Sequence, residues 1–162
     1  MVLPWQSHNC TCVPFVVVEP GTQYDAETDR VMLFSDNGPT RNVIRGPFPG
    51  ALLNGKAEPE PIELRAGTTY RFRLINIRTD YPASVALMSN GQPLEWRVVA
   101  KDGADLPPSQ AKVVPARLTF AAGEIFDVEF TARSGSDLFL QFGAPPQGPI
   151  PGQETRVPVK VR

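Results

Sequence analysis

A strict alternation of polar and apolar residues from Thr68 to Ile77 restricts the possible folds of this chain more than any other feature. Tyr70, Phe72 and Leu74 fall on one side of such a segment, and charged residues alternate with them. Residues two apart share a face in a β-strand, so this period predicts a strand with one buried face. The rest of the chain must therefore supply the layer that covers this face.

Two further strands are predicted directly after the first. They span Ala83–Met88 and Leu94–Ala100, and the turns that end them contain Asn90-Gly91 and Asp102-Gly103. Asn-Gly and Asp-Gly favour chain reversal between antiparallel strands because they tolerate positive φ. We therefore expect an antiparallel meander of three strands in this region.

Short strands separated by turn residues are predicted along the rest of the chain as well. The 18 prolines and 13 glycines favour many short elements, and no segment of ten residues has the period of a helix. Pro115 makes one of these segments either a bent strand or two pieces. The expected strands are Pro14–Glu19, Arg30–Ser35, Ala51–Leu53, Ile62–Leu64, Lys112–Phe120, Glu124–Thr131, Asp137–Phe142 and Thr155–Arg162. Together they predict an all-β protein, an antiparallel sandwich or barrel.

Composition excludes several classes of function. A chain of 162 residues can bury a core as one domain without disulfides or metals. The net charge is -1 and no basic stripe is present, which argues against nucleic acid as a partner. No apolar run is long enough to span a membrane, and the first residues lack the pattern of a signal peptide.

The charged residues of the central strand point to its outer face, and its large apolar residues to the core. Arg71 and Arg73 share a strand face, where ion pairs with Glu63, Glu95 or Asp102 are expected. We expect Phe72 and Trp96 to lie in the core.

Potential metal ligands gather near the amino terminus. His8, Cys10 and Cys12 form a His-x-Cys-x-Cys motif whose side chains share one face if the chain is extended. An imidazole with two thiolates could bind Cu(I) or Zn²⁺, although a closed zinc site takes four protein ligands. The alternative is an arm with unpaired thiols that binds nothing. Two thiols alone do not determine the cellular compartment or their own redox state.

Six short segments, in one order and spacing, carry a resemblance to a known family. They are Val16–Pro20, Asp29–Leu33, Leu52–Lys56, Gly67–Ile77, Ala100–Ala104, and Gly123-Glu124 with Asp127. In this order they resemble the second cupredoxin domain of the multicopper oxidases, the laccase-like enzymes. The resemblance covers almost all of residues 14–162 and implies a cupredoxin-like Greek-key β-sandwich.

The resemblance implies a parent enzyme that oxidises a phenolic, amine or metal-ion substrate and reduces dioxygen to water through bound copper. A blue-copper site takes two imidazoles and a thiolate, and this chain has a single histidine. Middle domains of three-domain members of the family are copper-free, which fits this composition. The chain by itself is therefore expected to hold no cofactor and to oxidise nothing.

The first residues resemble the end of a preceding domain. Trp5-Gln6-Ser7-His8 is similar to the family's Trp-Tyr-His-Ser-His copper motif, with Gln6 at the first histidine position and His8 at the second. The implied division is an arm at residues 1–13, a remnant of a preceding cupredoxin domain, and a cupredoxin-like domain at residues 14–162.

Asp80 is the candidate substrate-binding residue. In fungal laccases, a segment similar to Tyr70–Thr79 is followed by an acidic residue of the substrate pocket that accepts the phenol proton. Asp80 occupies this position without a gap, and a carboxylate there can act as a general base. The alternative is that Asp80-Tyr81-Pro82 is a hairpin turn in which the aspartate caps local amides.

The leading hypothesis is a copper-free domain with an architectural role. It would orient flanking copper-bearing cupredoxin domains, in the same chain or in an oligomer, and form one wall of the substrate cleft. The family resemblance implies a periplasmic or extracellular location. Two alternatives are a freestanding β-sandwich binding module and a copper-handling protein that uses His8, Cys10 and Cys12.

Overall fold

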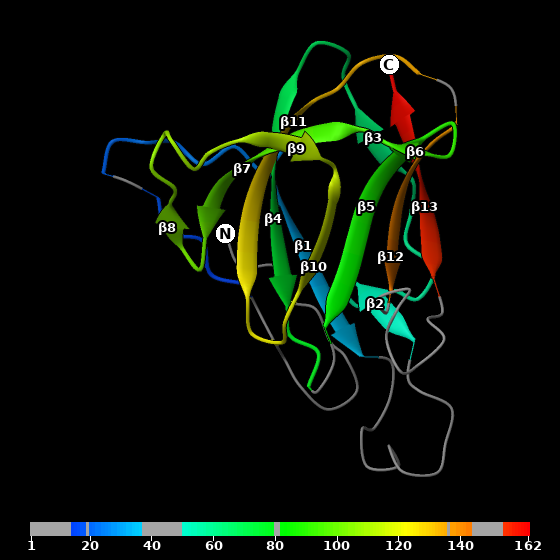
Figure 1. Cartoon of the computed structure of the whole chain (residues 1–162), viewed down its shortest axis with the longest axis horizontal. Coiled ribbons are helices and arrows are strands. Elements are labelled where there is room, and N and C mark those ends of the chain that lie inside the picture. The colour runs from blue at the N-terminus through cyan, green and yellow to red at the C-terminus, as the bar shows by residue number, and fades with distance from the viewer. Residues whose placement is uncertain (1–13, 19, 37–49, 80–81, 136, 144–153) are drawn as a thin grey trace.

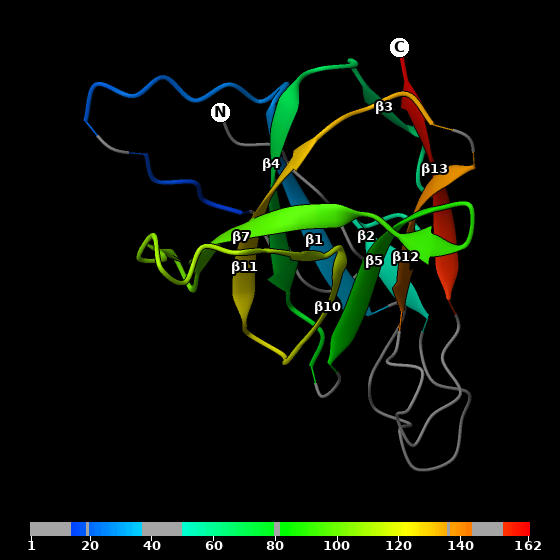
Figure 2. The same cartoon turned by 45° about the horizontal axis from the view of Figure 1, so that its top comes forward.

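The structure is a computed structural model of the chain that describes residues 14–18, 20–36, 50–79, 82–135, 137–143 and 154–162. All regular elements in these residues are β-strands, and they form two packed sheets (Figures 1 and 2). None of the described segments forms a helix that could cross a membrane. The protein is a two-layer β-sandwich, as predicted.

The larger sheet is built around strand β4. Its spatial order is β2-β1-β4-β11-β7-β8, and β9 also pairs with β7. Residues of β4 alternate between buried and partly exposed, so the predicted one-sided strand is confirmed. The strands of this sheet are β1 (Asp29–Asp36), β2 (Ala51–Leu53), β4 (Thr69–Asn76), β7 (Glu95–Lys101), β8 (Ala104–Asp105), β9 (Val113–Pro115) and β11 (Ile125–Thr131).

The smaller sheet covers the apolar face of the larger one. Its order is β10-β5-β12-β13-β3, and β6 pairs with β5. Its strands are β3 (Ile62–Leu64), β5 (Ala83–Ser89), β6 (Gln92–Pro93), β10 (Arg117–Phe120), β12 (Leu138–Gly143) and β13 (Thr155–Val161).

Both sheets contain one parallel pair of strands, which corrects the expectation of purely antiparallel pairing. In the larger sheet β1 runs parallel to β4, with Asp29 opposite Arg71. In the smaller sheet β13 runs parallel to β3, with Val159 opposite Ile62. Parallel neighbours need a long crossover connection, and the chain from β1 to β4 passes through both sheets. Turn residues reveal only local reversals, so they cannot predict such a pairing.

The predicted three-stranded meander is wrong in its pairing. β4 and β7 lie in the larger sheet with β11 between them, and β5 lies in the smaller sheet. The two turns themselves form as expected. Asn90-Gly91 joins β5 to β6, and Asp102-Gly103 joins β7 to β8. Both residues of each turn have positive φ, as in type I′ hairpins.

The segment from Pro14 to Val18 is not the buried strand that its sequence predicts. Phe15 is 86% exposed and Val17 is 75% exposed. Residues 14–18 form no strand, and no backbone hydrogen bond joins them to another described residue. A β-branched run forms a strand only where a partner strand exists, and the described residues provide no partner for this segment.

The segment around Pro115 consists of two strands that belong to different sheets. β9 pairs with β7 in the larger sheet, and β10 pairs with β5 in the smaller one. Between them, the Ala116 N–H donates to the Leu94 carbonyl, and the Ala116 carbonyl accepts from the Leu87 N–H. Proline cannot donate to a sheet, which suits this crossing point.

Aromatic side chains fill the space between the sheets. Phe34 of β1 is fully buried and lies 5.9 Å from Phe120 and 5.6 Å from Phe142, measured between ring centroids. Because Phe34 belongs to the larger sheet and both neighbours to the smaller one, these rings join the two layers. Phe72 and Trp96 are buried, as expected.

Candidate functional site

The connection between β4 and β5 carries the candidate residue Asp80. Asp80 and Tyr81 are not among the described residues, but the chain on both sides of them is. β4 ends at Asn76 and β5 begins at Ala83, so this connection lies at the end of the sandwich toward which β4 runs, the lower end in Figure 1.

A buried ion pair fixes the first half of this connection. Arg78 Nε donates to Asp36 Oδ1 at 2.6 Å, and both side chains are almost fully buried. The backbone N–H and the hydroxyl of Thr79 both donate to Asp36 Oδ2 at 3.1 Å. Asp36 is the last residue of β1, so the pair ties this connection to the end of a neighbouring strand.

Asn76 extends the same network into the core. Its Nδ2 donates to the carbonyl of Phe120 at 3.1 Å, and its Oδ1 accepts from the Arg78 N–H at 3.0 Å. Arg78 Nη1 reaches the Pro82 carbonyl at 3.4 Å, on the far side of Asp80. Hydrogen bonds to Asp36 and Arg78 thus anchor the described chain on each side of Asp80.

A second cluster of charges lies on the outer face of the larger sheet; we call it the arginine–aspartate network (Asp29, Arg71, Arg73, Asp105 and Asp127). Asp127 Oδ2 accepts from Arg71 Nε at 2.8 Å and from Arg73 Nη1 at 3.0 Å. Arg73 also makes a two-pronged contact with Asp29, at 2.7 and 2.6 Å. Arg71 reaches the exposed Asp105 at 3.2 Å.

The sequence predicts Glu63, Glu95 or Asp102 as partners of the two arginines, and this prediction is wrong. β11 lies between β4 and β7 and places Asp127 directly opposite Arg73. β7, which carries Glu95 and leads into the turn at Asp102, is therefore separated from β4 by one strand. Asp127 stands out in the sequence as a charged residue in the apolar segment EIFDVEFT. The sequence does not show that this segment pairs with the strand that carries Arg71 and Arg73.

Two groups around this network keep their protons at neutral pH. The hydrogen bond from Arg73 to Asp29 raises the pKa of the guanidinium further. Burial, followed by the charge of Asp29, raises the pKa of the Tyr24 hydroxyl, which donates to the Asp29 carbonyl at 2.9 Å. Near pH 7 both groups are therefore protonated, and neither is available there as a proton acceptor.

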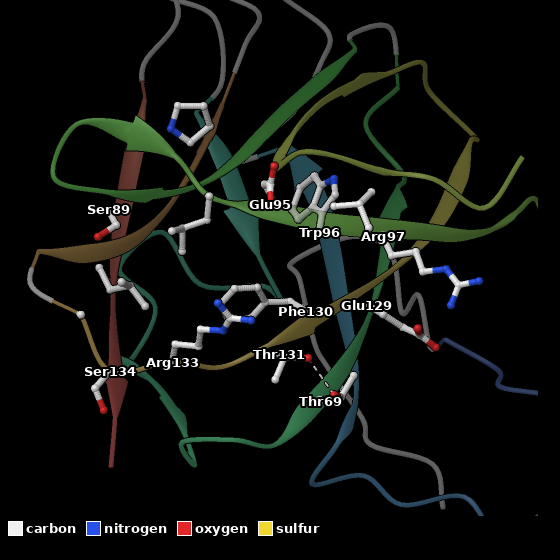
Figure 3. A pocket seen from close by; sticks show the side chains of 15 residues that line it. Thr69, Ser89, Glu95, Trp96, Arg97, Glu129, Phe130, Thr131, Arg133 and Ser134 are labelled. Carbon is white, nitrogen blue, oxygen red and sulfur yellow. Dashed lines mark hydrogen bonds between the residues drawn. The ribbon is translucent and has the colours of Figure 1, made fainter.

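An open groove of about 840 Å³ lies at the opposite end of β4 (Figure 3). Trp96 and Phe130 contribute apolar surface to it, and the hydroxyls of Thr69 and Thr131 lie 2.8 Å apart at its side. Two glutamates and two arginines also line it, so it has no preference for one sign of charge. Because Thr69 begins β4 and Asn76 ends it, the groove and the connection that carries Asp80 lie at opposite ends of the sandwich.

Copper of the blue type does not fit the described sandwich. The described residues contain no group of three or more His, Cys, Asp or Glu side chains that could hold a metal ion. The only histidine of the sequence and both cysteines, His8, Cys10 and Cys12, fall in residues 1–13, which are not described. The described domain thus has neither imidazole nor thiolate, the ligands that such a site takes. The proposed ligand set at the amino terminus stays a prediction.

Solved structures similar to this chain include multicopper oxidases. Fet3p, a multicopper oxidase that functions in iron import, matches with a TM-score of 0.67 and 14% identity over 90% of this chain and 30% of its own. McoA from the hyperthermophile Aquifex aeolicus matches with a TM-score of 0.64 and 18% identity, over 83% of this chain and 32% of its own. The blue copper oxidase from Nitrosomonas europaea matches with a TM-score of 0.59 and 23% identity, over 88% of this chain and 48% of its own.

These likenesses establish the fold. The chain is a cupredoxin-like β-sandwich that spans one third to one half of the length of the structures named. No protein-family model and no curated protein matches its sequence. The predicted fold class is confirmed.

Proposed function

We propose that this chain is a copper-free cupredoxin domain of a multicopper oxidase, with an architectural and substrate-cleft role. One observation carries the proposal: a cupredoxin-like sandwich whose described residues include no imidazole and no thiolate. A domain with this fold and this donor set can position other domains but cannot transfer electrons through copper of its own.

The parent reaction in this proposal is the oxidation of a phenolic, amine or metal-ion substrate, coupled to the reduction of dioxygen to water. Copper in the flanking domains, in the same chain or in an oligomer, supplies the redox chemistry. The location that suits such an enzyme is the periplasm or the extracellular space. The sandwich contributes rigidity, because the Arg78–Asp36 pair and the arginine–aspartate network fix the residues around two of its surfaces.

Metal content tests this proposal directly. Purified chain, incubated with copper and then dialysed, is expected to retain no stoichiometric copper and to show no absorption band near about 600 nm. The measurements are elemental mass spectrometry and a visible spectrum. A blue band, or one copper for each chain, contradicts the proposal.

The copper-handling alternative rests on His8, Cys10 and Cys12 and is tested by the same preparation. If copper is retained, a Cys10→Ser, Cys12→Ser double variant shows whether these thiols hold it. Copper that is lost in the variant would make the amino-terminal motif the functional site. Copper that persists in the variant would point to other ligands and contradict both hypotheses.

Asp80 is proposed as the proton acceptor of the substrate cleft. In the complete oxidase, Asp80→Asn is expected to lower kcat/KM for a phenol by about 100-fold, because oxidation of a phenol releases a proton. Ferrocyanide, which gives up an electron without a proton, should be oxidised at an unchanged rate. The control is Glu58→Gln, at an exposed carboxylate on another connection. An equal loss of kcat/KM with the phenol and with ferrocyanide would show that Asp80 supports the structure and accepts no proton from the substrate.

A further inference from the structure

The outer face of the smaller sheet carries an excess of positive charge. The six strands of this sheet contain one acidic residue, Glu63, and three basic residues, Arg117, Arg156 and Lys160. Glu63 already pairs with Arg162, whose Nη2 lies 2.9 Å from the carboxylate. The three basic side chains are exposed, and none of them forms an ion pair with a described residue. This face therefore attracts an anionic partner.

The larger sheet differs in this respect. On its outer face, Arg71 and Arg73 both bond to Asp127, and Arg73 also pairs with Asp29. The acidic groups of the arginine–aspartate network are thus already neutralised within the molecule. A second copy of this chain would offer few free carboxylates to the basic face, so the better partner is a separate anionic molecule.

Two rows of side chains cross the smaller sheet in the same direction, at right angles to its strands. The strand register places four residues in the polar row, across β10, β5, β12 and β13: Arg117, Ala86, Gln141 and Arg156. The adjacent row is apolar and contains Met88, Phe139 and Pro158. Neighbouring strands lie about 4.8 Å apart, so the polar row extends for about 14 Å. A linear polymer can lie along both rows at once.

The side chains of the polar row suit a ligand with carboxylates and hydroxyls. A guanidinium binds a carboxylate through two parallel hydrogen bonds. The Arg156 guanidinium already lies over the ring of Phe139, 4.9 Å from its centroid, so it loses less freedom when a ligand binds. The Gln141 amide can both donate to and accept from a hydroxyl. On the other side of this row, the hydroxyls of Thr119 and Ser84 lie 3.4 Å apart.

We propose that the outer face of the smaller sheet binds an acidic polysaccharide, a chain of sugars that carry uronate carboxylates. The carboxylates bond to Arg117 and Arg156, and sugar hydroxyls bond to Gln141 between them. The apolar faces of the sugar rings lie against Phe139 and Pro158. A single-stranded nucleic acid suits this face less well, because its bases stack on exposed aromatic rings. On the outer face of the six described strands, the only aromatic ring is that of Phe139, which is half-buried and lies beneath Arg156.

This inference goes beyond the proposed function, since it gives the sandwich a ligand of its own. The two fail separately, because no residue of this face belongs to either copper hypothesis. Copper bound by the chain would end the proposed function and leave the polysaccharide site intact. Failure to bind a polysaccharide would leave the copper result unchanged.

Isothermal titration calorimetry of the 162-residue chain with an oligogalacturonate tests the proposal. The oligogalacturonate is expected to bind. Its methyl ester has the same sugar backbone without the charges and should bind at least about 10-fold more weakly, because the carboxylate–guanidinium pairs are lost. A polyglutamate with the same number of charges should also bind at least about 10-fold more weakly, because it has no hydroxyls for the Gln141 amide.

Two variants identify the face that binds. Arg117→Gln and Arg156→Gln should each weaken binding of the oligogalacturonate by about 10-fold. Both side chains are exposed, so neither change should unfold the chain. The matched control is Arg97→Gln, at an exposed arginine of β7 in the larger sheet, which should leave the affinity unchanged. In a nuclear magnetic resonance titration, the amide signals of β5, β10, β12 and β13 should shift, and those of β11 should not.

Several results would overturn the proposal. They are no binding of the oligogalacturonate, equal binding of its methyl ester or of the polyglutamate, and an equal loss of affinity in Arg97→Gln. Amide signals that shift in the larger sheet and not in the smaller one would also overturn it.

Discussion

Replacing Phe34 with alanine should lower the free energy of unfolding by about 4 kcal/mol, the usual range for a large aromatic residue truncated in a tight core. Phe34 has no exposed surface and contacts the rings of Phe120 and Phe142 on the opposite sheet. Its removal leaves a cavity between the two layers that the backbone of neither sheet can close. The ring contacts add to the loss, since edge-on aromatic pairs contribute beyond their buried area.

Equilibrium denaturation in urea, followed by tryptophan fluorescence, measures this loss. The control is Phe139→Ala on β12, a half-buried phenylalanine with the Arg156 guanidinium 4.9 Å from its ring centroid. That change should cost about 1 kcal/mol, since it removes an outer-face contact and leaves no core cavity. A cost below about 1 kcal/mol for Phe34→Ala would contradict the packing of the two sheets described above.

Asp127→Ala should lower the free energy of unfolding by about 3 kcal/mol. The change removes the buried carboxylate that neutralises two guanidinium groups. The Asp127 side chain is only 6% exposed and bonds to both Arg71 and Arg73. Removing one partner of a buried ion pair costs 3–5 kcal/mol in general. The lower end of that range applies here, since Arg73 retains Asp29 and Arg71 retains Asp105.

The matched control for this prediction is Asp105→Ala. Asp105 pairs with the same arginine at 3.2 Å, but its side chain is 81% exposed. Exposed pairs contribute about 0–1 kcal/mol, so this variant should unfold almost as the parent chain does. Equal losses of unfolding free energy in the two variants would show that burial does not determine how much each aspartate stabilises the network. Arg71→Met in the Asp127→Ala background should recover part of the loss, because it removes one of the uncompensated charges.

The candidate residues differ in how far the sequence could identify them. The sequence indicates Asp80 by its position directly after the segment Tyr70–Thr79. In the structure, Arg78 and Thr79 just before it bind Asp36. Nothing in the sequence links residues 36 and 78, which are far apart in the chain. The parallel pairing of β1 and β4 brings the ends of these strands together, and this pairing depends on the whole sandwich.

The error at Pro14–Glu19 has the same origin as the errors in strand pairing. The sequence shows correctly that residues 14–18 favour an extended, buried strand. Which sheet accepts a strand depends on free edges and on covered faces, and these exist only after the chain has folded. An exposed Phe15 beside a sandwich with short edges is the consequence.

Local sequence patterns are enough to predict the all-β class, the one-sided burial of β4 and the chain reversals at Asn90-Gly91 and Asp102-Gly103. Each of these depends on residues that are neighbours in the chain, through side-chain period or allowed φ. The tertiary structure alone decided that β11 separates β4 from β7, that β1 and β4 are parallel, and that Asp127 neutralises the two arginines. These features depend on contacts between distant segments, which form only when both sheets bury their apolar faces against each other.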